Sequence, residues 1–359
     1  MTDTPILRLV DLRKSFGSLN AVDGINLDIH DGEFFTVVGP SGSGKTTLLR
    51  MLAGMERPSS GDILLRGARI NEIPANRRPT CMVFQSLALF PHRTVGQNIE
   101  FSLKMKGVAP DERRARCDQL MTQLHLPADY YGKNVTQCSG GERQRVALAR
   151  ALAFDPEILF FDEPLSAIDY KLRKTLEKEL KDIHRETGKT FIYITHSLEE
   201  AMVMSDRIGI MRAGQLEQVG TPDEIYNQPQ SRFVSEFMGE VNVIEVEAAE
   251  GGRLRCASLD ADFRGPDFGE GRAPNGFARG HLVIRPEYLR FLQSAGDADN
   301  AIRGTLYNEY SLGSRIQYQV RVGERVFLVE KLREQRYEGA LDDAVTIGWD
   351  ARDSILVAE

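Results

Sequence analysis

Short apolar runs alternate with amphipathic segments along the first half of the chain. Residues 34–38, 158–161 and 190–195 are almost entirely apolar, aromatic or β-branched, which predicts buried strands. Residues 47–53 follow the first run as a helix that ends at a glycine, and residues 171–187 have the spacing of an amphipathic helix. Strands that alternate with helices predict a parallel sheet covered by helices.

The pattern changes twice along the chain. Residues from about 87 to 153 are mostly of helical type, which predicts a helical subdomain inserted in the parallel fold. After residue 238, short strand-like runs alternate with Gly, Asp and Asn turns, and residues 250–280 have the composition of loops. We therefore expect an α/β domain over residues 1–238 and a small all-β domain of barrel type over residues 239–359.

Composition narrows the class of protein. The 359 residues are 42% hydrophobic and carry a formal charge of −7, which disfavours a generic basic nucleic-acid binder. No apolar run approaches the roughly 18 residues of a membrane helix, and the first residues lack the pattern of a secretory signal. The four cysteines are widely spread without a CxxC pair, so we expect a reducing cytoplasm and neither a disulfide scaffold nor a zinc cluster.

A glycine-rich segment between the first buried strand and its helix matches the phosphate-loop pattern GxxxxGK[ST] in full. Glycines let backbone N–H groups converge on phosphate oxygens, and the helix N-terminus adds a favourable dipole. The lysine then reaches the outer phosphates and the threonine hydroxyl can bind Mg²⁺. The residues expected to contact the nucleotide here are Gly39, Pro40, Ser41, Gly42, Ser43, Gly44, Lys45, Thr46 and Thr47.

Two acidic residues, Asp162 and Glu163, follow directly after the second buried strand. A carboxylate at the tip of such a strand can hold a hydrated metal ion, and its neighbour can orient or deprotonate an attacking water. Alone, an apolar run that ends in two acids is a common solvated strand end. Downstream of a phosphate loop, the pair predicts Asp162 as a Mg²⁺ ligand and Glu163 as the catalytic base.

The segment Ser139-Gly140-Gly141-Glu142-Arg143-Gln144-Arg145 opens a predicted helix whose N-terminus can face an anion. Together with the phosphate loop, this segment resembles the signature motif of ATP-binding cassette (ABC) ATPases. The resemblance covers residues 5–239 and implies a P-loop NTPase fold that binds ATP and Mg²⁺. It also implies that the nucleotide lies between the phosphate loop of one copy and the signature serine of a second copy, hence a homodimer.

Other residues match the family pattern in order. Phe16 stands where the family places an aromatic that stacks on adenine, and Gln85 resembles the glutamine that meets the metal and the attacking water. Asp169 closes a segment, Ser166-Ala-Ile-Asp169, that resembles the loop after the catalytic acid, and His196 resembles the histidine that contacts the γ-phosphate. Each is common singly; in this order they identify a nucleotide site.

Three residues depart from the family pattern. Cys138 and Ile168 stand where leucine is usual, and Glu142 stands where glutamine is usual. Ile168 conserves volume. Cys138 is smaller and could loosen local packing, and Glu142 adds negative charge beside a polyphosphate, so the rate of hydrolysis is the property these changes put in question.

The region after residue 238 resembles the OB-like, TOBE-type regulatory domain of bacterial solute-importer ATPases, through Ile284-Arg-Pro-Glu287 and a Gly304-to-Gly313 segment. The resemblance implies two membrane permease subunits, an external solute-binding protein and a peripheral location on the cytoplasmic side of the cell membrane. Leu165–Lys174 and Phe233–Asn242 look most like the ATPases of spermidine/putrescine importers. Importers of ferric iron, sulfate or sugar remain alternatives.

Two further hypotheses belong to other classes. One is a nucleic-acid-remodelling ATPase that uses a basic, aromatic groove around Arg315, Tyr318 and Arg321. The neighbouring acids disfavour that groove, so no nucleic acid is expected. The other is a regulatory module with vestigial ATP hydrolysis, which the intact Lys45 and Glu163 disfavour.

Overall fold

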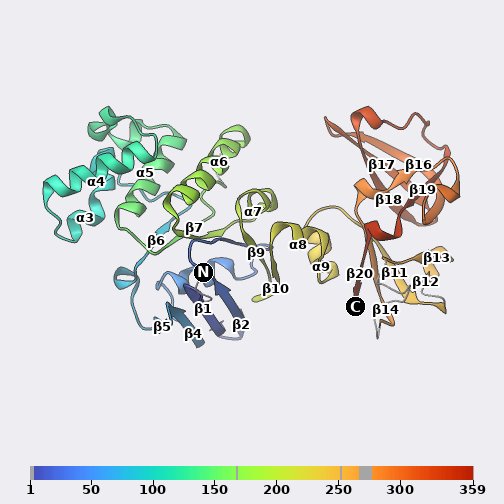
Figure 1. The fold of residues 1–359 in the computed structure, drawn as a ribbon, viewed down its shortest axis with the longest axis horizontal. Coiled ribbons are helices and arrows are strands. Elements are labelled where there is room, and N and C mark those ends of the chain that lie inside the picture. Colours follow the sequence, from blue (N-terminus) through green and yellow to red (C-terminus); the bar gives the residue numbers. More distant parts are fainter. Residues whose placement is uncertain (1–3, 167–168, 251–252, 267–276, 359) are drawn as a thin grey trace. The chain divides into compact units, whose positions relative to one another are not determined.

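The chain forms two compact units. The computed structural model describes residues 4–166, 169–250, 253–266 and 277–358, and these divide into Met1–Pro222 and Asp223–Glu359 (Figure 1). The expected boundary at 238/239 differs from this division by the short helices α8 (Pro222–Asn227) and α9 (Arg232–Phe237). Both helices are tied to the second unit, because the buried Arg285 donates to Tyr226 O at 3.0 Å and to Ser235 O at 3.3 Å.

The first unit is built on a six-stranded sheet in the order β10-β9-β3-β8-β7-β6. The strands from β9 to β6 are parallel and β10 runs antiparallel to β9. This confirms the α/β fold predicted from the alternation of apolar runs and helices. The strands are β3 Phe34–Val38, β6 Thr80–Val83, β7 Ile158–Asp162, β8 Thr190–Ile194, β9 Arg207–Arg212 and β10 Gln215–Gly220.

A second, antiparallel sheet of the same unit has the order β2-β1-β4-β5. This sheet was not predicted from the sequence, because its strands alternate buried and exposed residues and carry several bulges instead of forming a continuous apolar run. Its strands are β1 Leu7–Phe16, β2 Leu19–Ile29, β4 Ser60–Leu65 and β5 Ala68–Arg69.

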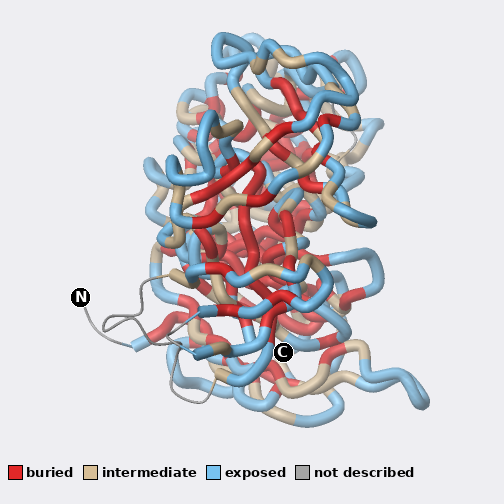
Figure 2. Tube along the Cα trace, turned by 90° about the vertical axis from the view of Figure 1, so that its right-hand side faces the viewer, coloured by how far each residue is buried: buried red, intermediate tan, exposed pale blue. Residues whose placement is uncertain are grey.

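Helices cover the six-stranded sheet and make up the inserted subdomain (Figure 1). Alternate residues of the buried strands enter two separate cores, with Phe161 and Phe191 in one and Phe160 and Ile192 in the other. The two-residue period of a strand explains this division. Figure 2 shows buried segments of the chain enclosed by exposed ones. The helices are α1 Lys45–Leu52, α2 Val95–Ile99, α3 Phe101–Met105, α4 Pro110–Gln123, α5 Gly140–Ala153, α6 Tyr170–Thr187 and α7 Leu198–Met204.

The second unit contains two five-stranded antiparallel sheets around one core, in the orders β13-β12-β11-β14-β20 and β15-β19-β16-β17-β18. Asn242 on β11 joins the sheets, because its side chain donates to Leu328 O at 2.9 Å and accepts from Leu328 N at 2.7 Å. The strands are β11 Asn242–Ala248, β12 Arg253–Cys256, β13 Ala261–Arg264, β14 Arg279–Ile284, β15 Arg290–Phe291, β16 Asn300–Ser311, β17 Arg315–Val322, β18 Arg325–Leu332, β19 Ala344–Trp349 and β20 Ser354–Ala358.

The expectation of loops over residues 250–280 was wrong where β12 and β13 form a hairpin. Each strand has only four residues, and only Leu254, Cys256 and Phe263 among them are buried, which is too few for a visible period. Among the residues that the structure describes, no helix is long and apolar enough to cross a membrane.

Candidate nucleotide-binding site

The phosphate loop connects β3 to α1 and its backbone requires glycine at two positions. A Cβ atom at Gly39 would lie 2.1 Å from Met211 O, and one at Gly44 would lie 2.0 Å from Ala21 O. Gly44 also has a φ of 104° and Gly42 a φ of 78°, in the region that favours glycine. Closely packed backbone therefore fixes the shape of the loop, and this shape suits a polyphosphate.

Helix α1 begins directly after this loop with free N-terminal amides. Its N-cap is Gly44, which has no side chain to cap the helix, and its first turn contains no acidic residue. The first four N–H groups of a helix lack partners within the helix, so they can donate to an anion. Thr46 is exposed and Thr47 is partly exposed in this turn.

The Lys45 side chain is only 7% exposed. Its Nζ donates to Gly39 O at 2.7 Å and to Pro40 O at 3.0 Å, so the ammonium bonds to carbonyls of the loop itself. Burial lowers the pKa of Lys45, and the nearby Glu163 and Asp162 oppose that shift. The lysine and the two acids predicted from separate motifs thus act on one another electrostatically.

Asp162 and Glu163 lie at the carboxyl end of β7, beside Ile194 at the end of β8. Burial raises the pKa of Asp162, and the charge of Glu163 raises it further. Glu163 Oε2 lies 3.1 Å from Nδ1 of His196. The structure therefore brings together three residues that the sequence placed in two distant segments.

His196 stands on a rigid support that the sequence analysis missed. Glu200 on α7 is 2% exposed, and its carboxylate accepts from Tyr193 OH at 2.8 Å and Thr195 Oγ1 at 2.7 Å. Thr195 Oγ1 in turn accepts from Ser197 N at 2.9 Å, which fixes the turn on both sides of His196. Burial, followed by the charge of Glu200, raises the pKa of Tyr193 well above its ordinary value.

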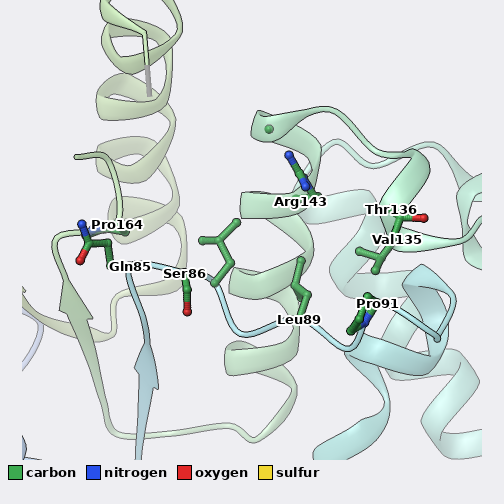
Figure 3. A pocket seen from close by; sticks show the side chains of 10 residues that line it. Gln85, Ser86, Leu89, Pro91, Val135, Thr136, Arg143 and Pro164 are labelled. Atoms are coloured by element: carbon green, nitrogen blue, oxygen red, sulfur yellow. The ribbon is translucent and has the colours of Figure 1, made fainter. Parts of the chain in front are cut away.

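Gln85 follows β6 and reaches the same edge of the sheet. Its Nε2 donates to Ser166 Oγ at 2.7 Å, and Ser166 Oγ donates to Glu163 O at 3.0 Å. Gln85 and Pro164 also line a cavity of about 330 Å³ that extends toward Val135 and Arg143 of the helical subdomain (Figure 3). The spacing of residues along the sequence carries no sign of this Ser166 bridge, because its two partners follow different strands.

The signature segment forms a complete capping box at the start of α5. Ser139 is the N-cap and accepts from Glu142 N at 3.3 Å, while Glu142 Oε2 accepts from Ser139 N at 2.7 Å. Tyr130 OH donates to Glu142 Oε1 at 3.1 Å and Lys133 Nζ lies 3.8 Å from Oε2. These contacts, the Ser139 amide first, lower the pKa of Glu142. The Glu142 carboxylate is thus stabilised by the first turn of α5 and by two neighbouring side chains.

The remaining expected residues fall on neighbouring elements. Cys138 is buried at 6% exposure, and Asp169 is the N-cap of α6, where it accepts from Leu172 N at 3.1 Å. A Cβ at Gly141 would meet Leu172 at 3.5 Å, so the signature glycines pack near the start of α6. Ile168 lies outside the described residues.

Phe16 ends β1 with its ring 49% exposed, and Lys14 Nζ lies 4.9 Å from the ring centre. An exposed aromatic ring at a strand end is available to a planar partner.

Comparison with known proteins gives consistent results along the chain. Residues 22–166 match the ABC transporter family and residues 282–357 match the TOBE domain family. The spermidine/putrescine import ATP-binding protein PotA of Rubrobacter xylanophilus is 43% identical over 98% of this chain and 93% of the relative. The protein of that name from Pseudomonas aeruginosa strain UCBPP-PA14 is 45% identical over 90% of both chains.

Solved structures match about 60% of the chain. The structure of cbiO1 from Clostridium perfringens, part of the ABC transporter complex cbiONQ, has a TM-score of 0.57 at 28% identity and covers 62% of this chain and 91% of that one. The dimeric structure of MJ0796, a bacterial ABC transporter cassette, has a TM-score of 0.53 at 30% identity and covers 60% of this chain and 98% of that one.

Proposed function

The chain belongs to the family of ATP-binding subunits of ABC transporters, and on that premise we propose that it hydrolyses ATP to power the import of polyamines such as spermidine or putrescine. The observation that carries the choice of solute is the likeness, over nearly the whole chain, to relatives named for spermidine and putrescine import. Importers of ferric iron, sulfate or sugar are the alternatives that the experiments below separate.

The phosphate loop binds the triphosphate in this proposal. The backbone N–H groups of the loop, except at Pro40, which has none, and the free N-terminus of α1 donate to phosphate oxygens. Lys45 turns from the loop carbonyls to the outer phosphates. Thr46, Asp162 and Gln85 would hold Mg²⁺, which neutralises developing phosphate charge when bound. Phe16 stacks on the adenine through its exposed ring face.

Hydrolysis depends on Glu163 and His196 in the proposed mechanism. Glu163 orients and deprotonates the attacking water, and His196, held 3.1 Å from it, stabilises charge on the transferred group. The buried Glu200 supports the turn that carries His196 and so keeps this pair aligned. Ser139 and Asp169 act from a second copy, with the signature glycines allowing close approach.

One copy of the chain carries one phosphate loop and one signature segment, so two copies build two sites. The dimeric cassette among the similar structures supports this homodimer. We further propose that the C-terminal unit supports or regulates the dimer, since all the nucleotide-binding residues precede it.

Membrane permease subunits are the partners that polyamine import requires. A groove of about 980 Å³ beside Gln85 and its following segment is suited to an apolar helix, since Phe90, Phe101 and Met105 line it. Arg150 donates to Leu87 O and Ala88 O at 2.7 Å, which ties the groove to the Gln85 segment. In this proposal the subunit works on the cytoplasmic side of the cell membrane, and a solute-binding protein delivers the polyamine from outside.

A nucleic-acid-remodelling ATPase is not favoured. Tyr318, the central aromatic of the suggested groove, is fully buried, and its hydroxyl oxygen accepts from Tyr337 N at 2.9 Å within the domain. Arg315 is paired with Glu330 at 2.8 Å. A stacking platform needs exposed rings and free cations.

The Glu163→Gln variant tests the enzymatic part of the proposal. It should bind ATP as the wild type does and lose roughly 10²–10⁴-fold in hydrolysis rate, because the amide cannot accept the proton of the water. Near-normal turnover of the purified variant would remove Glu163 from this role.

The choice of solute has a separate test. The complete transporter is co-purified through this subunit, and the solute-binding protein is screened against spermidine, putrescine, ferric iron, sulfate and sugars. Tight binding of a polyamine alone supports the proposal, whereas binding of another class replaces the solute and leaves the ATPase role intact.

A further inference from the structure

Ser166 connects two predicted catalytic residues through a single hydroxyl group. The hydroxyl accepts from Gln85 Nε2 at 2.7 Å and donates to Glu163 O at 3.0 Å. A hydroxyl that accepts one hydrogen bond donates a stronger one, because the two bonds polarise each other. The three residues therefore form one continuous chain of hydrogen bonds.

The backbone of Glu163 needs such support. Glu163 has a φ of 45°, a conformation that costs a non-glycine residue stability unless its surroundings hold it. Its N–H donates to Ile194 O at 3.0 Å, and its C=O accepts from Ser166 N at 3.3 Å as well as from the Ser166 hydroxyl. These bonds on both sides of the residue fix the direction in which its carboxylate points, toward His196.

Gln85 lies at the other end of the chain, where the structure is more open. Its side chain is exposed, whereas Ser166 is half-buried, and the segment after Gln85 lines both the cavity of Figure 3 and the groove proposed for the permease. A displacement of that segment would break the hydrogen bond between the Gln85 amide and Ser166. Its effect on Glu163 would therefore pass through Ser166.

We propose that Ser166 is a positioning residue that transmits the position of Gln85 to the backbone of Glu163. This inference rests on the proposed function, in which Glu163 is the base and the Gln85 segment faces the membrane subunits. Ser166 acts through its hydrogen bonds to Gln85 and to the backbone of Glu163. Its effect is on the orientation of the carboxylate.

A double-mutant cycle tests the link in the complete transporter. Ser166→Ala should lower kcat for ATP about tenfold, the value of one well-placed hydrogen bond, with KM changed less than about twofold. Ser166→Thr keeps the hydroxyl and should restore most of kcat. In a Gln85→Ala background, Ser166→Ala should cost less than about twofold, since the shared bond is already gone.

Amide hydrogen exchange of the nucleotide-free protein supplies a readout that does not depend on activity. Ser166→Ala and Gln85→Leu should each speed exchange of the Ser166 amide and leave the amides of α4 unchanged. Ser231→Ala is the matched control, because it removes a serine N-cap from α9 in the other unit. It should alter neither kcat nor exchange near Ser166.

The outcomes separate the positioning role from the proposed function. Equal kcat losses from Ser166→Ala in both backgrounds, or unchanged exchange in Gln85→Leu, would overturn the link while an inactive Glu163→Gln variant keeps the ATPase role. An active Glu163→Gln variant overturns the proposed function itself. If Ser166→Ala does not fold, the exchange of the Ser166 amide in Gln85→Leu decides the proposal alone.

Discussion

Helices α1 and α5 both begin in glycine-rich segments, yet their first turns are completed in opposite ways. Helix α1 has Gly44 as N-cap and Thr47 at the third helical position, with no acid in the turn. Helix α5 has Ser139 as N-cap and Glu142 at the third position, and the two residues close a reciprocal capping box. The N-cap and the third helical residue thus leave the first N–H groups of α1 without side-chain partners, whereas in α5 they bond to each other.

The difference separates two uses of a helix N-terminus. Free amides and an absent acid make the α1 end a strong site for a polyphosphate. The α5 end has satisfied part of its own donor capacity, so its proposed contribution is the exposed face of Ser139 and the adjoining glycines. The capping box also explains how the cassette accommodates Glu142, because Ser139 N, Tyr130 and Lys133 contact its carboxylate.

The largest effect should come from closing the α1 end with a single carbon atom. Gly44→Ala places a Cβ 2.0 Å from Ala21 O at a φ of 104°, so ATP affinity should fall more than about 100-fold. Gly42→Ala is the matched control, because its φ is also positive but no atom lies within 4 Å of the new Cβ. The ATP affinity of the Gly42→Ala variant should stay within about tenfold of the wild-type value. Equal losses measured by calorimetry would contradict a role for the close contact.

An intermediate effect should follow when α1 is given the acid that α5 has. Thr47→Glu introduces a negative charge at the third position, and like charges about 6 Å apart near a protein surface repel by about 2–3 kcal/mol. ATP affinity should therefore fall about 10–100-fold, whereas the neutral Thr47→Gln control should change it little. An unchanged affinity in Thr47→Glu would show that the phosphates bind elsewhere.

The smallest effect should come from removing the acid of α5. Glu142→Gln keeps the capping box but loses the charged contacts, so the free energy of unfolding at pH 7 should drop by about 0.5–1 kcal/mol. Because the folded state lowers the pKa of Glu142, that stability is present above the unfolded-state pKa and is lost as pH falls through the folded-state pKa. Denaturant titrations of both proteins at neutral and acidic pH should therefore converge at acidic pH. If the difference in free energy of unfolding between the two proteins is the same at both pH values, the effect comes from packing and not from charge.

The strand and the helix that flank the phosphate loop were predictable because the whole segment is contiguous in the sequence. The glycines, Lys45 and Thr46 are fixed by local spacing, and the flanking strand and helix were visible as an apolar run and an amphipathic segment. Bonds between segments were not predictable in this way. Ser166 contacts Gln85, 81 residues earlier, because β7 pairs with β6. Glu200 contacts Thr195, 5 residues earlier, because α7 folds back onto the end of β8.

The second unit shows the same limit for the fold. The longer strands β17 and β18 belong to the strand-like runs expected after residue 238, but β12 and β13 contain too few buried side chains to show a period. Their stability comes from antiparallel pairing with β11 and with each other, which depends on residues elsewhere in the chain.

ATP hydrolysis by the complete transporter in liposomes, with its solute-binding protein, tests the central claim that this chain powers polyamine import. We expect spermidine or putrescine to raise the hydrolysis rate of the wild type and to leave the Glu163→Gln variant inactive. Stimulation by ferric iron, sulfate or a sugar, with none by either polyamine, would contradict the claim.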